Sequence, residues 1–161
     1  MFNLKAEFYL KIIFLFSFIA LISAFFIEYA LGHQPCNLCL IERIPYGLSI
    51  MIIMAIFLTK KNQKFLVLLL ILIFVFSFTF SFYHFGIEQG FFKESSVCGV
   101  RSLTESITKE DLLKQLSEKK ISCRDVTFRI FGLSLTSINI VISLLFIITL
   151  LKIFTKYEKN K

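Results

Sequence analysis

The segment FLVLLLILIFVFSFTFSFYHF, from Phe65 to Phe85, decides the class of this protein. It contains no charged residue apart from the titratable His84, and the next charge along the chain is Glu88. A helix rises 1.5 Å per residue, so about 20 apolar residues cross a hydrocarbon core about 30 Å thick. Backbone groups in lipid must be hydrogen-bonded within the segment, which a helix achieves. The segment therefore predicts a membrane-spanning helix.

Three more apolar stretches of similar length accompany it. With 57% hydrophobic residues and a mean hydropathy of +0.78, a chain of 161 residues cannot bury its apolar surface in a soluble domain. The first stretch is longer than the core of a cleaved signal peptide and has Glu28 near its end, so we expect it to be retained. The predicted fold is all-α: one domain, a four-helix transmembrane bundle. Its helices are expected at about residues 12–31, 40–58, 65–85 and 130–151, with outer loops at about 32–39 and 86–129.

The lysines indicate how the bundle is oriented. Nine lysines lie near the N-terminus, between the second and third stretches, and in the C-terminal tail, where they are accompanied only by Glu7 and Glu158. The loop at 86–129 is nearly neutral, with eight Lys/Arg and seven Asp/Glu. Positive residues concentrate on the cytoplasmic side, so both termini are predicted to be cytoplasmic. The net charge of +7 then reflects topology and contact with anionic lipid, not binding of nucleic acid.

All four cysteines fall in the predicted outer loops. Cys36 and Cys39 form a Cys-X-X-Cys pair directly after Pro35, a residue that suits the first turn of a helix. Unpaired N–H groups and the helix dipole at such an end stabilise a thiolate, the nucleophile of disulfide exchange. Cys98 and Cys123 lie in the long loop. Two pairs facing the same compartment favour electron transfer from one pair to the other.

A short amphipathic helix is predicted between the two loop cysteines. Thr108 is a capping residue with Asp111 at the third position, and Leu112, Leu113 and Leu116 form an apolar stripe. The helix is expected to rest on the membrane surface or on the other loop, and plain packing within the loop is an equal alternative. Its position between Cys98 and Cys123 is compatible with their pairing.

Three ionisable residues lie at the predicted outer boundary of the membrane. Arg43 is one helical turn from Cys39, where a cation is costly and therefore a functional candidate. It would stabilise the Cys39 thiolate or polarise a carbonyl of a redox ligand; the alternatives are a pair with Glu28 or Glu42, or a side chain reaching the interface. His84 is a candidate for contact with such a ligand or for proton relay, or else an interfacial histidine bonded to water or a loop carbonyl. Glu28 is treated as interfacial.

Two other uses of the cysteines must be weighed. Static disulfides would persist in an oxidising outer compartment. A metal site would use all four cysteines, with His33 as a further ligand, but structural zinc sites have two closely spaced pairs, which Cys98 and Cys123 are not. We therefore expect redox chemistry and no metal.

The motif Pro-Cys-Asn-Leu-Cys-Leu-Ile-Glu-Arg, from Pro35 to Arg43, resembles that of the DsbB family of membrane disulfide-generating proteins. The resemblance extends to Cys98 and Cys123 in the second outer loop and to the segment Phe131–Leu135 before the last helix. It covers nearly the whole chain in topology. It also implies a bacterial inner-membrane protein with its cysteines on the periplasmic side.

The resemblance further implies the order of electron transfer. A DsbA-like dithiol partner attacks the Cys98–Cys123 disulfide at Cys98, Cys123 exchanges with Cys36, and Cys39 passes electrons to ubiquinone or menaquinone, with Arg43 and His84 as quinone-binding candidates. A vitamin K epoxide reductase-like enzyme is the alternative enzyme class, but its Cys-X-X-Cys is expected late in the bundle. A non-catalytic four-span protein with structural disulfides is the alternative outside enzymes.

Overall fold

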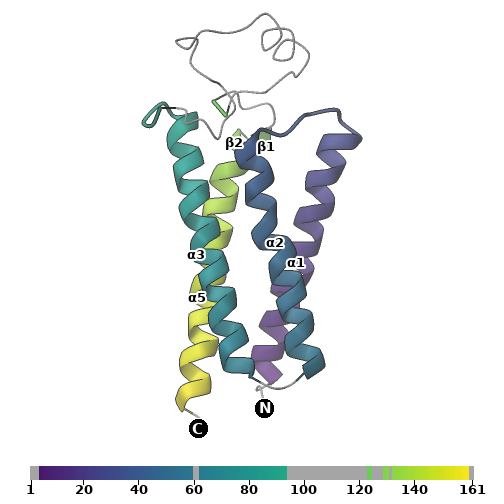
Figure 1. Cartoon of the computed structure of the whole chain (residues 1–161), viewed down its shortest axis with the longest axis vertical. Coiled ribbons are helices and arrows are strands. Elements are labelled where there is room, and N and C mark those ends of the chain that lie inside the picture. Colours follow the sequence, from purple (N-terminus) through teal and green to yellow (C-terminus); the bar gives the residue numbers. More distant parts are fainter. Residues whose placement is uncertain (1–3, 60–61, 94–122, 125–128, 131, 160–161) are drawn as a thin grey trace, which may run out of the picture.

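The computed structural model describes residues 4–59, 62–93, 123–124, 129–130 and 132–159. It confirms the all-α four-helix bundle, and all four helices are long and apolar enough to cross a membrane. The start of α1 and the end of α5 lie at one end of the bundle, and the start of α2 lies at the other (Figure 1). The elements are α1 (Leu4–Tyr29), α2 (Asn37–Thr59), α3 (Gln63–Glu88), β1 (Arg129–Ile130), β2 (Leu133–Ser134) and α5 (Leu135–Lys159).

The helix ends differ from the expected ones by several residues. The first helix begins at Leu4, so it includes lysines that were expected to precede it. The last begins at Leu135 instead of near residue 130, because β1 and β2 form an antiparallel hairpin in which Gly132 has a φ of 81°. Charge-free length locates a span but does not locate its ends, which turns and caps decide. The amphipathic helix predicted around residues 108–116 lies outside the described residues.

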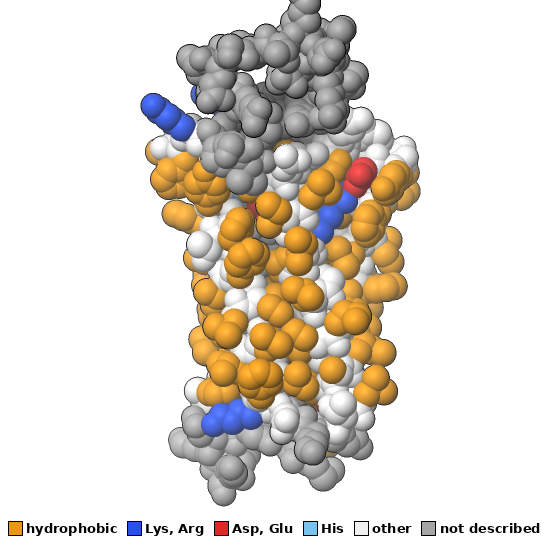
Figure 2. Space-filling view, in the orientation of Figure 1, with side chains coloured by type: hydrophobic (Ala, Val, Ile, Leu, Met, Phe, Trp, Pro, Cys, Tyr) orange, Lys and Arg blue, Asp and Glu red, His pale blue; other side chains and the backbone are white. Residues whose placement is uncertain are grey.

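Packing within the bundle is uneven. The most extensive interface joins α3 and α5, while α2 contacts both α1 and α3. Phe74 is fully buried at the centre, with its ring 5.0 Å from Phe146 and 6.3 Å from Tyr46 in edge-to-face arrangements. Apolar side chains also cover much of the outer surface between the bundle ends (Figure 2). Such a surface suits contact with lipid on all sides.

Small polar side chains cross the helix interfaces. The Ser49 hydroxyl donates to Ser17 of α1 at 3.0 Å, and the Ser143 hydroxyl donates to Ser77 of α3 at 3.1 Å. All four serines are fully buried. Small residues let helix backbones approach closely in lipid, and their hydroxyls hydrogen-bond between helices. These contacts fix the relative rotation of the helices that carry the site.

The third helix ends in a Schellman motif. Gly90 adopts a left-handed conformation with a φ of 78°, its N–H donates to the Ile87 carbonyl at 3.0 Å, and the Phe91 N–H donates to the Gly86 carbonyl at 2.8 Å. The returning chain places the ring of Phe92 where a side chain on Gly86 would have to lie. The motif therefore ends α3 next to the buried cysteines, against which Ile87 packs.

Candidate active site

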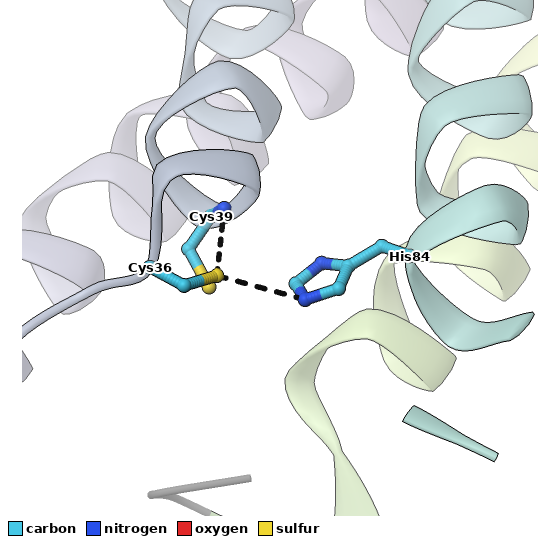
Figure 3. Close-up of side chains that lie close together, drawn as sticks. All are labelled: Cys36, Cys39 and His84. Atoms are coloured by element: carbon cyan, nitrogen blue, oxygen red, sulfur yellow. Dashed lines mark hydrogen bonds between the residues drawn. The ribbon is translucent and has the colours of Figure 1, made fainter. Parts of the chain in front are cut away.

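Cys36 caps the start of α2. Its carbonyl accepts the first helical hydrogen bond, from the Leu40 N–H at 3.2 Å, and its sulfur accepts a hydrogen bond from the Cys39 N–H at 3.2 Å (Figure 3). A side chain that accepts from the third helical N–H occupies the N-cap position. The sulfur of Cys36 thus meets the positive end of the helix, although Pro35 precedes the N-cap and does not lie in the first turn. Cys39 lies in the first turn.

Cys123 is buried against this capping cysteine. It belongs to one apolar cluster with Cys36, Leu38 and Ile87, and 2% of its surface is exposed. The structure has Cys36, Cys39 and Cys123 as thiols. Cys98 lies outside the described residues. The long loop therefore delivers one of its two cysteines to the Cys-X-X-Cys motif.

Electrostatics at the site favour the thiolate form of Cys36. Hydrogen bonds from Cys123 and then Cys39 lower the pKa of the Cys36 thiol well below its ordinary value of 9.0, and His84 lowers it further. Burial opposes this shift but is outweighed. A thiol of low pKa departs readily from a disulfide, whereas its intrinsic nucleophilicity falls with its pKa. The electrostatics therefore suit Cys36 to be the sulfur that leaves a disulfide.

His84 of α3 is an internal residue of the site. Its Nε2 lies 3.6 Å from the Cys36 sulfur, and its ring points from α3 toward the start of α2 (Figure 3). Its Nδ1 lies 2.9 Å from Glu42 Oε1 and 3.5 Å from the Thr136 hydroxyl. With 2% of its surface exposed, it is not the interfacial histidine that the sequence offered as an alternative. Its partners are side chains of α2 with its N-cap and of α5.

A group of buried polar residues behind His84 was missed by the sequence reasoning. Glu42 Oε2 accepts a hydrogen bond from Asn139 at 3.1 Å, and the Asn139 amide also donates to Ser81 at 2.7 Å and accepts from the Tyr46 hydroxyl at 2.5 Å. A buried asparagine in an otherwise apolar span is a detectable signal, because polar residues inside a membrane are costly. The residues it contacts could not be read from its spacing.

Arg43 faces α1. Its guanidinium pairs with Glu28 at 2.5 Å, lies 3.5 Å from the Ala24 carbonyl, and sits 5.3 Å from the centre of the Phe25 ring. The pair with Glu28 is one of the alternatives considered for Arg43, and it gives Glu28 a structural partner. Both side chains are about one-fifth exposed at the edge of the bundle.

The thiols and the imidazole also form a potential ligand set for a metal. The donor atoms of Cys36, Cys39 and His84 all lie within 4.8 Å of one another. Two thiolates and an imidazole suit a soft or borderline cation such as zinc. A disulfide between the two cysteines would remove both sulfur ligands, so metal binding and redox cycling exclude each other here.

Comparison with known proteins shows which protein family this chain is related to. The family model described as Disulfide bond formation protein DsbB matches residues 6–153. A similar protein is the uncharacterized protein RP370 of Rickettsia prowazekii (strain Madrid E), 28% identical over 147 residues that cover 90% of this chain and 86% of the relative. No solved structure matches the chain. Since the family match covers nearly the whole chain, this multi-pass membrane protein belongs to the DsbB family of disulfide bond formation proteins.

Proposed function

We propose that this protein is a protein-dithiol:quinone oxidoreductase that reoxidises a soluble, thioredoxin-like dithiol protein of the DsbA type. One observation carries the proposal: Cys123, from the long loop, lies buried beside Cys36 and hydrogen-bonds to it. Static Cys36–Cys39 and Cys98–Cys123 disulfides would not require Cys36 and Cys123 to lie in contact. Disulfide exchange requires it, because a thiolate must attack a neighbouring sulfur.

The exchange proceeds in four balanced steps. A partner thiolate attacks Cys98 of the Cys98–Cys123 disulfide, which forms a mixed disulfide and releases Cys123 as a thiolate. Cys123 then attacks Cys36 of the Cys36–Cys39 disulfide and releases Cys39. The second partner thiolate completes the partner's disulfide and frees Cys98. Cys98 finally attacks Cys123, which re-forms the Cys98–Cys123 bond and releases Cys36, so that both electrons of the dithiol reach the Cys36–Cys39 pair.

A membrane quinone, ubiquinone or menaquinone, is the proposed acceptor of the two electrons and two protons. Cys39 and Arg43 are the residues that would hold it, since they lie one helical turn apart on α2 and Arg43 is partly exposed at the bundle edge. The guanidinium donates hydrogen bonds suited to a quinone carbonyl. The ring nitrogens of His84 already face Cys36 and Glu42, so a contact of His84 with the quinone would require exchange of one of these hydrogen bonds.

The proposed location is the bacterial inner membrane, with the cysteines on the periplasmic side. The distribution of lysines supports this orientation. The fold agrees with it, because the start of α1 and the end of α5 share the end of the bundle opposite to the start of α2 (Figure 1). An oxidising outer compartment is also where disulfides are made and persist.

Reconstitution tests the proposal directly. The purified protein in lipid nanodiscs is mixed with a reduced DsbA-type protein and either ubiquinone or menaquinone, and quinone reduction is followed by absorbance. Serine at Cys36 or Cys39 should abolish quinone-dependent oxidation, and serine at Cys98 should abolish the mixed disulfide with the partner. Full activity of either Cys36→Ser or Cys39→Ser would contradict the relay. Capture of the partner on Cys123 would contradict its order.

A further inference from the structure

His84 bridges a sulfur and a carboxylate. Its Nε2 faces the Cys36 sulfur at 3.6 Å, and its Nδ1 faces Glu42 Oε1 at 2.9 Å. The side chains of His84 and Glu42 are 3% and 12% exposed, so the contact is nearly shielded from solvent. A reactive cysteine, a histidine within reach and a third group that orients the histidine are the parts of a catalytic triad. Here α2 and its N-cap supply Glu42 and Cys36, and α3 supplies His84.

Glu42 is itself held in place from a third helix. Asn139 of α5 donates to Glu42 Oε2 and to the Ser81 hydroxyl, while its amide oxygen accepts from the hydroxyls of Tyr46 and Ser143. The carboxylate therefore offers its other oxygen to His84. A buried carboxylate at this depth is costly unless it is paired, and here both of its oxygens have partners.

A second carboxylate lies near the ring but is directed elsewhere. Glu88 Oε1 is 3.9 Å from His84 Nε2 and accepts the Thr136 hydroxyl at 2.5 Å, and Glu88 Oε2 has no hydrogen-bond partner among the described residues. The contact of His84 with Glu42 is a full ångström shorter. Among the described residues, Cys39 and Cys123 also act on Cys36, Tyr46 lies close to Glu42, and Arg43 and Glu28 pair with each other. Glu42 is thus the carboxylate that orients the ring.

We propose that Glu42 is a positioning residue that holds His84 against Cys36, so that the three side chains act as a cysteine–histidine–carboxylate triad. With a proton on Nδ1 shared with Glu42, Nε2 is left facing the sulfur. It accepts a proton from the Cys36 thiol, or as imidazolium donates a hydrogen bond to the thiolate. Glu42 stabilises the imidazolium and does not touch the reacting sulfur.

The triad acts at the step in which Cys36 is the leaving group of a disulfide. This role rests on the proposed function. The Cys98 thiolate attacks Cys123 of the Cys36–Cys123 disulfide; the Cys98–Cys123 bond forms, the Cys36–Cys123 bond breaks, and the electron pair goes to Cys36. This exchange involves no net oxidation. The protonated His84 stabilises the departing thiolate, which keeps Cys36 ready to re-form its bond with Cys39 as the quinone takes the two electrons.

The test measures Cys36 itself. In full-length protein with serine at the other three cysteines, the rate of iodoacetamide labelling is recorded against pH. Glu42→Gln keeps the size of the side chain but removes its charge, so the labelling midpoint should rise by about one unit and the rate at a pH below both midpoints should fall about tenfold. Glu28→Gln is the matched control: it removes a carboxylate at the same end of the bundle that pairs with Arg43, and it should leave the midpoint unchanged.

A double-substitution cycle separates positioning from a general effect on the fold. If Glu42 acts through His84, the midpoint of Glu42→Gln combined with His84→Gln should equal that of His84→Gln alone. Additive shifts, or an unchanged midpoint in Glu42→Gln, would overturn the triad. Glu42→Asp, which retains the charge, should recover part of the shift and serves if the Gln variant does not fold.

The same measurement distinguishes the triad from the proposed function. Wild-type protein that does not reduce quinone, but shows the expected shift in Glu42→Gln, would refute the oxidoreductase and keep the triad. Active wild-type protein with no shift in Glu42→Gln would refute the triad alone. Glu88→Gln should give a smaller shift than Glu42→Gln, because its carboxylate lies farther from the ring.

Discussion

Replacement of Asn139 by alanine should destabilise the bundle by about 3 kcal/mol. Asn139 is 7% exposed and joins three helices through bonds to Tyr46, Ser81 and Glu42. Hydrogen bonds between helices in membranes average about 0.6 kcal/mol, and bonds to charged groups contribute about 1.5 kcal/mol or more. Two neutral bonds and one to a carboxylate give the estimate, and Glu42 would be left buried with an unpaired oxygen.

The free energy of unfolding in mixed micelles, measured as the denaturing detergent fraction is raised, checks this magnitude. Thr149→Ala is the control on the same helix, because Thr149 is half-buried and its hydroxyl donates within its own helix, to the Leu145 carbonyl one turn away. It should change stability by no more than about 0.5 kcal/mol. Equal effects of Asn139→Ala and Thr149→Ala would show that the polar network does not hold the helices together. A double-mutant cycle that combines Asn139→Ala with Tyr46→Phe should give a coupling free energy of about 0.6 to 1.7 kcal/mol.

Three further outcomes are expected. Gly86→Ala should destabilise the protein in thermal unfolding, because a Cβ there would collide with the Phe92 ring, whereas Gly47→Ala, with open space around it, should be neutral or stabilising by up to about 1 kcal/mol. The pKa of Cys36 is lowered on folding, so its contribution to the stability of the reduced protein is complete above pH 9.0 and is lost as the pH falls toward the lowered pKa. Chemical unfolding between pH 6 and 9 should therefore show rising stability in the reduced protein, and a flat profile matching Cys36→Ser would contradict the shift. Arg43→Gln combined with Glu28→Gln, which leaves no unpaired carboxylate, should slow quinone reduction relative to Glu28→Gln alone; equal quinone kinetics in the two would return Arg43 to a structural role.

The sequence alone determined the class of fold and predicted the Cys-X-X-Cys pair as the site. Four long apolar stretches can only be helices in lipid, because each must satisfy its own backbone hydrogen bonds, and this constraint acts locally along the chain. The Cys36–Cys39 pair could be placed at a helix start for the same reason, since Pro35 and the spacing of the cysteines are local features. The family resemblance carried by Pro35–Arg43 was confirmed by the match over residues 6–153.

The tertiary structure decided which residues meet. Spacing on α2 shows that Arg43 lies one turn from Cys39, but only the placement of α1 pairs Arg43 with Glu28. Likewise, Glu42 and His84 are read from the sequence as two ionisable groups on different helices, and the rotation of α2, α3 and α5 about one another brings them into contact.

Only the tertiary structure shows that Cys123 packs against Cys36 and where each helix ends. The contact joins residues far apart in the chain, and it depends on many side-chain contacts between helices. The length of an apolar stretch predicts a span but does not predict how the helices pack against one another.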